Sequence, residues 1–172
     1  MTHIGEAVAR GGRDAWDSPA ADGGRDTWGY PAAHGGHGTP DSLVVVAAVV
    51  VQEGRLLVVS KKAAPDVFYL PGGKPDAGEE PLEALARELD EELGARPVAP
   101  EFLAEIESTA ALEGVPLQLT VFTAGLSQVP RPAAELAHLR WITGTETDIQ
   151  LAPAVAEQIL PMLRRDGLVP VA

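Results

Sequence analysis

The amino-acid sequence predicts an α/β fold in which a mixed β-sheet lies between helices. Three observations carry this prediction. The run from Leu43 to Val51 is rich in β-branched residues, as expected of a strand covered on both faces. An amphipathic helix follows at Pro81 to Leu93, and further short strands separate it from a second helix at Pro153 to Arg165. Because strands and helices follow one another in this order, we expect helices on both faces of the sheet.

The first strand is expected to open the folded domain. Gln52 to Arg55 form a turn, and Leu56 to Ser60 provide a second strand that would pair with the first as a hairpin. After a proline-containing loop, Phe68 to Leu70 form a short extended piece that stops at Pro71.

The helix at 81–93 has signals at both of its ends. Pro81 suits the first turn, and Gly94 suits the C-terminal end. An apolar stripe at helical spacing should pack on the sheet; it comprises Leu82, Leu85, Ala86, Leu89 and Leu93. The remaining predicted strands are Phe102 to Thr109, Leu117 to Ala124 and Leu139 to Ile142.

Residues 1–40 have the composition of a low-complexity tail, dominated by Gly, Pro, Ala and Asp. The segment Gly11 to Asp22 returns, slightly changed, as Gly23 to His34, so the tail contains a twelve-residue repeat. Two copies are too few to build a solenoid. We therefore expect a disordered tail over 1–40, followed by one domain over 41–172.

Composition excludes several classes of function. The net charge of -12 argues against a polynucleotide partner, whereas a small phosphorylated ligand would need local cations or bound metal. The chain of 172 residues has no cysteine, hence no disulfide framework and no thiolate nucleophile. We expect a cytoplasmic protein without a membrane partner, because no apolar segment is long enough for a signal peptide or a span. A homodimer is left open.

Three glutamates on the 81–93 helix form the first candidate site. Glu88, Glu91 and Glu92 are spaced so that their carboxylates share one side of the helix, and Arg87 is the only cation between 81 and 93. Several carboxylates on a rigid element suit a hard divalent cation. A solvated acidic helix face is the alternative.

The loop before this helix favours the metal interpretation. Gly72 and Gly73 allow the backbone to approach a ligand or to present a carbonyl to a metal ion. Lys74 places a positive charge beside them.

Together, the loop and the helix resemble the Nudix box, the signature of the MutT-like Nudix hydrolases. Its fixed positions fall at Gly73, Glu79, Arg87, Glu88, Leu89, Glu91, Glu92 and Gly94. Only the last aliphatic position departs, because Ala95 is smaller than the family's usual residue. The resemblance implies a Nudix-type α/β/α sandwich over residues 42 to 165 and a pyrophosphohydrolase that uses Mg²⁺, with Mn²⁺ as an alternative cofactor.

The resemblance also implies roles for individual residues. Glu88, Glu91 and Glu92 would be metal ligands, together with the Gly73 carbonyl. A metal-activated water would attack one phosphorus of a diphosphate, and no covalent intermediate is required.

Arg87 would orient one of the glutamates; a simple surface ion pair is the alternative. Glu79 would hold the loop or bind metal through water. Glu135, in a segment similar to that of MutT-like proteins, and Glu91 are rival candidates for the general base. Lys61 and Lys62 would bind phosphate unless they are only a basic strand end.

The substrate class stays broader than the reaction. Val155 occupies the position where relatives often carry Asn or Asp to read a base, and valine cannot hydrogen-bond a base edge. We expect a nucleoside triphosphate or another nucleoside diphosphate derivative, with ADP-ribose or a nucleotide sugar as the alternative. A module that senses nucleotides without cleaving them is the alternative of another class.

Overall fold

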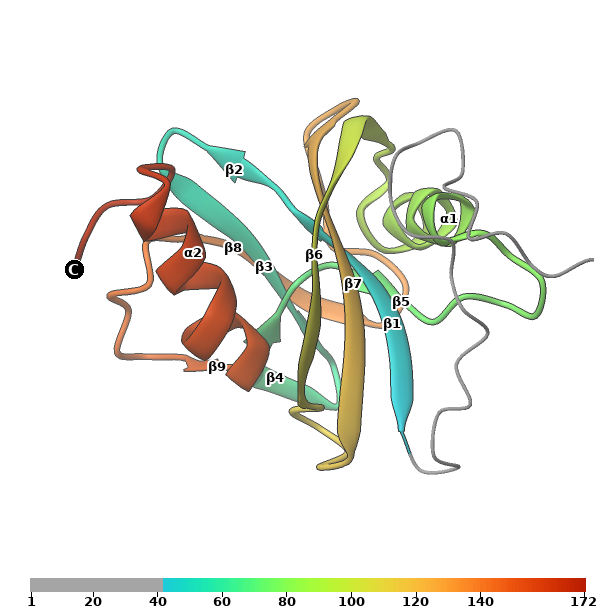
Figure 1. Cartoon of the computed structure of the whole chain (residues 1–172), viewed down its shortest axis with the longest axis horizontal. Helices are drawn as coiled ribbons and strands as arrows, with labels where there is room; N and C mark the ends of the chain where they lie inside the picture. The colour runs from blue at the N-terminus through green and yellow to red at the C-terminus, as the bar shows by residue number, and fades with distance from the viewer. Residues whose placement is uncertain (1–41) are drawn as a thin grey trace, which may run out of the picture. The chain divides into compact units, whose positions relative to one another are not determined.

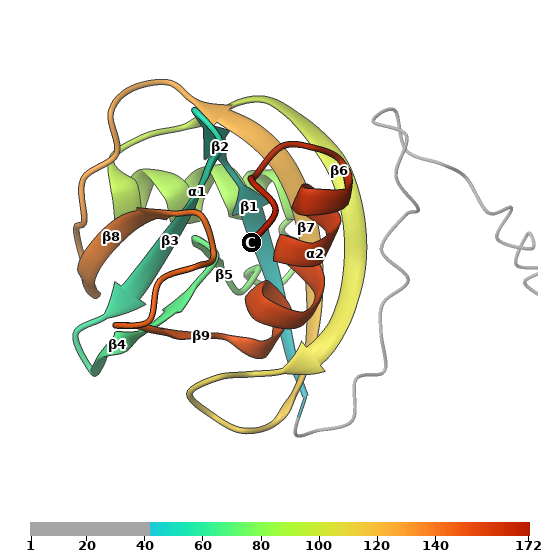
Figure 2. The same cartoon turned by 90° about the vertical axis from the view of Figure 1, so that its left-hand side faces the viewer.

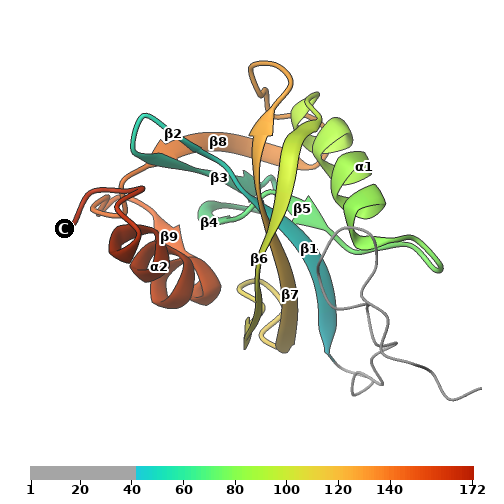
Figure 3. The same cartoon turned by 45° about the horizontal axis from the view of Figure 1, so that its top comes forward.

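The structure is a computed structural model, and it describes residues 42–172. The repeat-containing tail expected over 1–40 lies outside these residues. The described part contains two β-sheets that cross one another, with helices on either side (Figures 1 and 3). This arrangement is the α/β/α sandwich that the sequence predicts.

The first sheet has the strand order β5-β1-β7-β6. Its members are β1 (Leu43–Val49), β5 (Gly72–Gly73), β6 (Pro97–Thr109) and β7 (Pro116–Leu126). β1 runs parallel to β7 and antiparallel to β5, and β6 and β7 form a long antiparallel pair. The sheet is therefore mixed, as expected.

The second sheet has the order β2-β3-β4-β9, and β8 pairs with the other side of β3. Its members are β2 (Val51–Gln52), β3 (Arg55–Lys61), β4 (Ala64–Tyr69), β8 (Leu136–Ile142) and β9 (Gln150–Leu151).

The predicted hairpin is wrong for most of its length. The apolar run divides at Val50: β1 pairs with β7 in the first sheet, and only β2 continues into a hairpin with β3. At Val50 the chain passes from one sheet to the other. The Val50 carbonyl accepts a hydrogen bond from the Leu57 N–H at 2.9 Å at this point. Val50 is as apolar and β-branched as its neighbours, so no local signal marks this break.

Several strands are longer than predicted. β4 begins at Ala64 and includes Pro65, where a loop was expected, and β9 was not predicted. β6 begins at Pro97, and β8 begins at Leu136. The start of β4 pairs with the neighbouring β3, where Lys61 is opposite Ala64. The added parts of β6, β8 and β9 pair with strands distant in the sequence, which local patterns do not report.

The helices cover opposite sides of the first sheet (Figures 1 and 2). α1 (Pro81–Leu93) packs on β5 and β1. A π-helical turn, η1 (Val155–Ile159), continues into α2 (Leu160–Arg165), and both pack in the main hydrophobic core between the sheets. No helix among residues 42–172 is both long and apolar enough to cross a membrane.

The buried side of α1 differs from the predicted stripe. Leu82 and Ala86 are only half-buried, whereas Ala84 and Glu92 are buried along with the leucines of the stripe. The helix is thus rotated about its axis relative to the prediction. As a result, the carboxylate of Glu92, which was expected beside the apolar stripe, lies on the packed face of the helix itself.

The π-helical turn has a cause in the sequence. Pro161 lacks an N–H, and its ring would clash with the carbonyl four residues earlier in a regular α-helix. The Leu160 N–H instead donates to the Val155 carbonyl, five residues back, which widens the helix locally.

Candidate active site

A cleft of about 360 Å³ opens beside the glycine loop, and elements of both sheets contribute to it. Its polar lining comes from α1, β3, β5 and the segment before β8, and includes Lys61, Lys74, Glu88, Glu92 and Glu135. Its apolar lining comes from β1, β7 and the start of η1, and includes Leu43, Val45, Leu117, Leu119 and Val155. The cleft therefore offers surface for charged groups and surface for an apolar or aromatic group.

Glu92 is the most unusual group in the cleft. Its residue is only 7% exposed, and its carboxylate accepts one long hydrogen bond, from the Gly72 N–H at 3.4 Å. Burial, aided by the neighbouring charge of Glu88, raises the pKa of Glu92 to about 7, against the opposing effect of that hydrogen bond. A buried carboxylate with so little compensation is suited to a cation.

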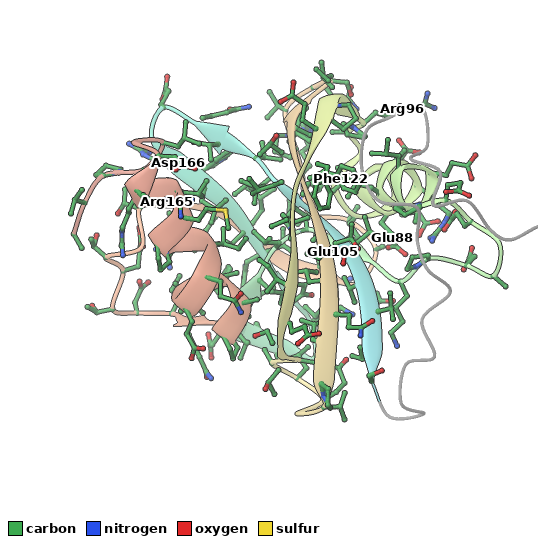
Figure 4. All side chains as sticks on the ribbon, viewed as in Figure 1. Glu88, Arg96, Glu105, Phe122, Arg165 and Asp166 are labelled. Atoms are coloured by element: carbon green, nitrogen blue, oxygen red, sulfur yellow. The ribbon has the colours of Figure 1, made fainter. Side chains whose placement is uncertain are left out.

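Two glycines allow the chain to pass between α1 and β1. A Cβ at Gly72, whose φ is +148°, would collide with the carbonyl oxygen of Val46. A Cβ at Gly73 would collide with the Glu88 carboxylate, which projects from α1 toward β5 (Figure 4). Glycine is thus required at 73 for the carboxylate to lie against the loop backbone.

Arg87 connects the loop to the helix. Its guanidinium donates two hydrogen bonds to Glu79, at 2.8 and 2.9 Å, and one to Glu88, at 2.9 Å. It also donates to the Lys74 carbonyl at 3.1 Å. Neither Arg87 nor Glu79 lines the cleft. Arg87 instead fixes the positions of Glu88 and of the Lys74 backbone, which border the cleft.

The lysines of the second sheet have different surroundings. Lys61 lines the cleft, and its ammonium lies 3.3 Å from the Glu135 carboxylate. Lys62 does not line the cleft, and its ammonium donates to the Ala134 carbonyl at 3.0 Å. Lys74 lines the cleft directly after the glycine pair. Of the expected phosphate-binding cations, the structure brings Lys61 and Lys74 together and leaves Lys62 outside.

Glu91 is separated from the two other glutamates of the helix. Its side chain is 57% exposed and lies 3.7 Å from Arg87, outside the cleft. Between residues 42 and 172, no three acidic or histidine side chains form a preassembled metal-binding group. The groups at hand are Glu88, Glu92 and the backbone of Gly73, and Glu91 would have to rotate to join them.

Sequence reasoning did not include Tyr69 or the apolar wall. Tyr69 ends β4 and lines the cleft just before the glycine loop. The wall comes from β1 and β7, whose alternating residues resemble ordinary core positions. In the sequence, only the position of Tyr69 four residues before Gly73 indicated that it could lie near the site.

A buried carboxylate on a helix, a glycine loop and two lysines meet in one cleft, a combination suited to a phosphorylated ligand. A family model, the NUDIX domain, matches residues 41–164. The chain therefore belongs to the Nudix hydrolase family and is an enzyme that hydrolyses phosphoanhydride bonds.

Similar proteins agree with this assignment. A Mycobacterium tuberculosis protein provisionally named 8-oxo-dGTP diphosphatase 2 is 34% identical over 115 residues, which are 64% of this chain and 81% of that protein. The MutT Nudix hydrolase structure from Burkholderia pseudomallei is 30% identical, with a TM-score of 0.57 over 66% of this chain and 92% of that one.

A third structure supports the fold alone. It is a bifunctional NMN adenylyltransferase/ADP-ribose pyrophosphatase from Francisella tularensis in complex with AMP and an Mn ion. It is 22% identical, with a TM-score of 0.56 over 73% of this chain and 42% of that one. Nudix hydrolases in general use divalent metal ions and small nucleotide substrates.

Proposed function

We propose that this chain is a magnesium-dependent pyrophosphohydrolase that cleaves a nucleoside triphosphate, or another nucleoside diphosphate derivative, by attack of water on phosphorus. The supporting observation is a single cleft that joins the carboxylates of Glu88 and Glu92 to an apolar wall. A nucleotide has the same division, with charged phosphates at one end and a flat base at the other.

The residues present fit a divalent ion. Glu92 is buried and poorly compensated, and Glu88 lies against the Gly73 backbone, so two carboxylates and a carbonyl would hold the ion. When bound, the ion would lower the pKa of a water and neutralise charge that develops on the phosphate oxygens. Arg87 keeps Glu88 in place, and it would do the same throughout turnover.

Glu135 is the better supported of the two candidate bases. Its exposed carboxylate lines the cleft, where it is free to accept a proton from water, and Lys61 holds it from one side. Glu91 would need to leave Arg87 and enter the cleft first. If Glu91 does rotate inward, it would serve as a further ligand rather than as the base.

Phosphate binding is assigned to the lysines in the cleft. Lys74 has no side-chain partner among those that the structure records for residues 42–172, and Lys61 is engaged by Glu135 alone. Both ammonium groups can therefore offer hydrogens to phosphate oxygens.

We do not expect Val155 to recognise the nucleotide base through hydrogen bonds. This residue belongs to the apolar lining of the cleft and offers no hydrogen-bonding atom beyond its backbone. The Mycobacterium tuberculosis relative nevertheless bears a name that refers to 8-oxo-dGTP, so oxidised and normal purine triphosphates belong in one substrate panel. ADP-ribose and nucleotide sugars are the alternative substrates.

A substrate screen with product identification tests the proposal. Wild type should hydrolyse at least one nucleotide when Mg²⁺ is present. In Glu92→Gln, kcat/KM should fall more than about a hundredfold, because losing a direct metal ligand should cost more than losing a residue that only holds a ligand in place. Asp90→Asn, which removes an exposed charge from the same helix, is the matched control. Pyrophosphate as product indicates a triphosphate substrate, whereas AMP with ribose phosphate indicates ADP-ribose. No turnover by wild type on the whole panel would refute the proposed function.

A further inference from the structure

The turn that connects β6 to β7 forms part of the cleft wall. The Ala110 N–H donates to the Val115 carbonyl at 2.9 Å, and the Gly114 N–H donates to the Ala110 carbonyl at 2.8 Å, so the turn is held by its own backbone. Residues 110–113 all line the cleft. Figures 1 and 3 show this turn beside the start of β1, on the side of the first sheet away from α1.

Strand pairing fixes the order of groups along the cleft. Ala47 pairs with Gly72 of the glycine loop, whereas Leu43 pairs with Leu117 near the turn. The distance along β1 from Leu43 to Ala47 is roughly 13 Å. Val45 lies between them, and alternate residues of a strand share one face, so all three line the cleft. The cleft thus extends from the glycine loop, past an apolar wall, to the β6–β7 turn.

Glu113 is the polar exception in this part of the cleft. Among the described residues that line it from β1, β7, η1 and the turn, only Glu113 has a side chain that can form hydrogen bonds. The residue is exposed, so a ligand can reach it. The pKa of Tyr69, which lines the cleft from β4, is raised by burial and then by the charges of three carboxylates: Glu92, Glu135 and Glu113. The Glu113 carboxylate is therefore close enough for its charge to act inside the cleft.

The charge of Glu113 limits what can lie beside it. A carboxylate only accepts hydrogen bonds, and it repels a phosphate group of the same sign. The part of a ligand at the turn is thus uncharged and carries hydrogen-bond donors. With the phosphates at the glycine loop, the base of a nucleotide is the part that lies farthest along the cleft. The N–H groups on base edges are donors of this kind, and the flat face of a base suits the apolar wall.

We propose that Glu113 is a specificity-determining residue whose carboxylate accepts a hydrogen bond from an N–H group of the nucleotide base, while the base packs against Leu43 and Leu117. This inference rests on the proposed function and narrows its substrate class to nucleotides whose base carries an N–H on its outer edge. A base edge with acceptors alone is disfavoured, because its lone pairs would face the carboxylate.

Glu113→Ala tests the contact because it removes the carboxylate from an exposed turn. With the best substrate of the panel, KM should rise about tenfold at nearly unchanged kcat, since the lost hydrogen bond lies away from the reacting phosphorus. The midpoint of urea unfolding should not change, because surface substitutions of this kind have little effect on stability. Glu107→Ala, which removes an exposed carboxylate from β6 outside the cleft, is the matched control and should leave KM unchanged.

Substrate analogues show which part of the nucleotide carries the donor. The best substrate is compared with its 2′,3′-dideoxy form and with an analogue whose base has no N–H group, such as unsubstituted purine in place of adenine or guanine. Glu113→Ala should show its defect in full on the dideoxy form. On the analogue without N–H groups, wild type and Glu113→Ala should have the same kcat/KM.

Several results would overturn the inference. Unchanged KM in Glu113→Ala, with an active wild type, removes the contact and leaves the proposed function standing. A defect that disappears on the dideoxy form assigns the carboxylate to a sugar hydroxyl and so contradicts the base contact. A loss of activity matched by a lower unfolding midpoint shows a structural role instead. A wild type inactive on every nucleotide refutes the proposed function and the contact together.

Discussion

At the scale of single residues, the site depends on groups that are poor choices for stability alone. Glu92 takes a place on the packed face of α1 where a leucine would add apolar burial. Its only hydrogen bond is long, so its charge is weakly compensated. The two glycines of the loop similarly give up side-chain packing to let the backbone approach β1 and Glu88. The chain tolerates these costs where the carboxylates gather.

Gly72→Ala should destabilise the fold. The added methyl would collide with the backbone of β1 at Val46, which cannot move without disturbing the sheet, and the φ of +148° adds strain. We expect the free energy of unfolding to fall by at least about 2 kcal/mol in urea titrations. Gly78→Ala is the control, because it has a positive φ but nothing within 4 Å of the new methyl. Equal losses in the two variants would contradict the assigned clash.

Gly73→Ala should damage activity more than stability. The new methyl would meet the Glu88 carboxylate, the far end of a flexible side chain that can swing away. We expect kcat/KM to fall more than about tenfold as Glu88 is displaced, while the free energy of unfolding changes by less than about 1 kcal/mol. Full activity in this variant would show that the position of Glu88 against the loop is unimportant.

At the scale of elements, the loop before α1 is held by ion pairing rather than by packing. Arg87 donates to Glu79 through two nitrogens and to the Lys74 carbonyl, so the loop is attached to the second turn of the helix. The Asp76 N–H adds a hydrogen bond to Glu79 at 3.0 Å. The same guanidinium holds Glu88, which couples the loop's position to the cleft.

The contribution of Glu79 to stability should depend on pH. Hydrogen bonds from Arg87, then from the Asp76 N–H, lower the pKa of Glu79 from 4.5 to about 2. Since the pKa is lower in the folded than in the unfolded protein, the contribution is fully present above pH 4.5 and is lost as pH falls toward 2.

Urea titrations of wild type and Glu79→Gln between pH 7 and pH 2, with chelator present, measure this contribution. The difference in free energy of unfolding should be constant above about pH 5 and should shrink toward zero on acidification. A difference that grows as the pH falls would mean that the sign is wrong and that Arg87 does not stabilise the charged form.

At the scale of the whole molecule, the cleft exists only because two sheets and α1 meet. Lys61 comes from the second sheet, Gly73 and most of the apolar wall come from the first, and the carboxylates of Glu88 and Glu92 come from α1. Binding in the cleft should therefore stabilise the entire fold, since the unfolded chain has no equivalent site.

Mg²⁺ should raise the stability of wild type through this linkage. At free Mg²⁺ about a hundred times the dissociation constant, the free energy of unfolding should increase by about 2.7 kcal/mol, and chelator should reverse the effect. Thermal unfolding with increasing Mg²⁺ measures the shift in Tm. Glu92→Gln should lose most of the shift, whereas Asp90→Asn should retain it. An equal shift in all three proteins would place the metal elsewhere.

The sequence was sufficient for features that depend on near neighbours. The helix at 81–93, its end at Gly94 and the placing of Glu88 and Glu92 one turn apart follow from periodicity and caps, which involve residues one or two turns apart. The Nudix box could be recognised for the same reason, since it lies within one continuous segment.

Pairing and orientation were decided by the tertiary structure. The division of the apolar run at Val50, the rotation that buries Glu92 and the exclusion of Lys62 and Glu91 from the cleft all depend on distant partners. The place of Glu113 beside the apolar wall likewise follows only from the pairing of β1 with β7. The sequence determines which chemical groups are available within a few residues of one another. Which of them face the same cleft is decided only when sheets formed from distant segments pack together, because side-chain direction depends on strand pairing and helix rotation.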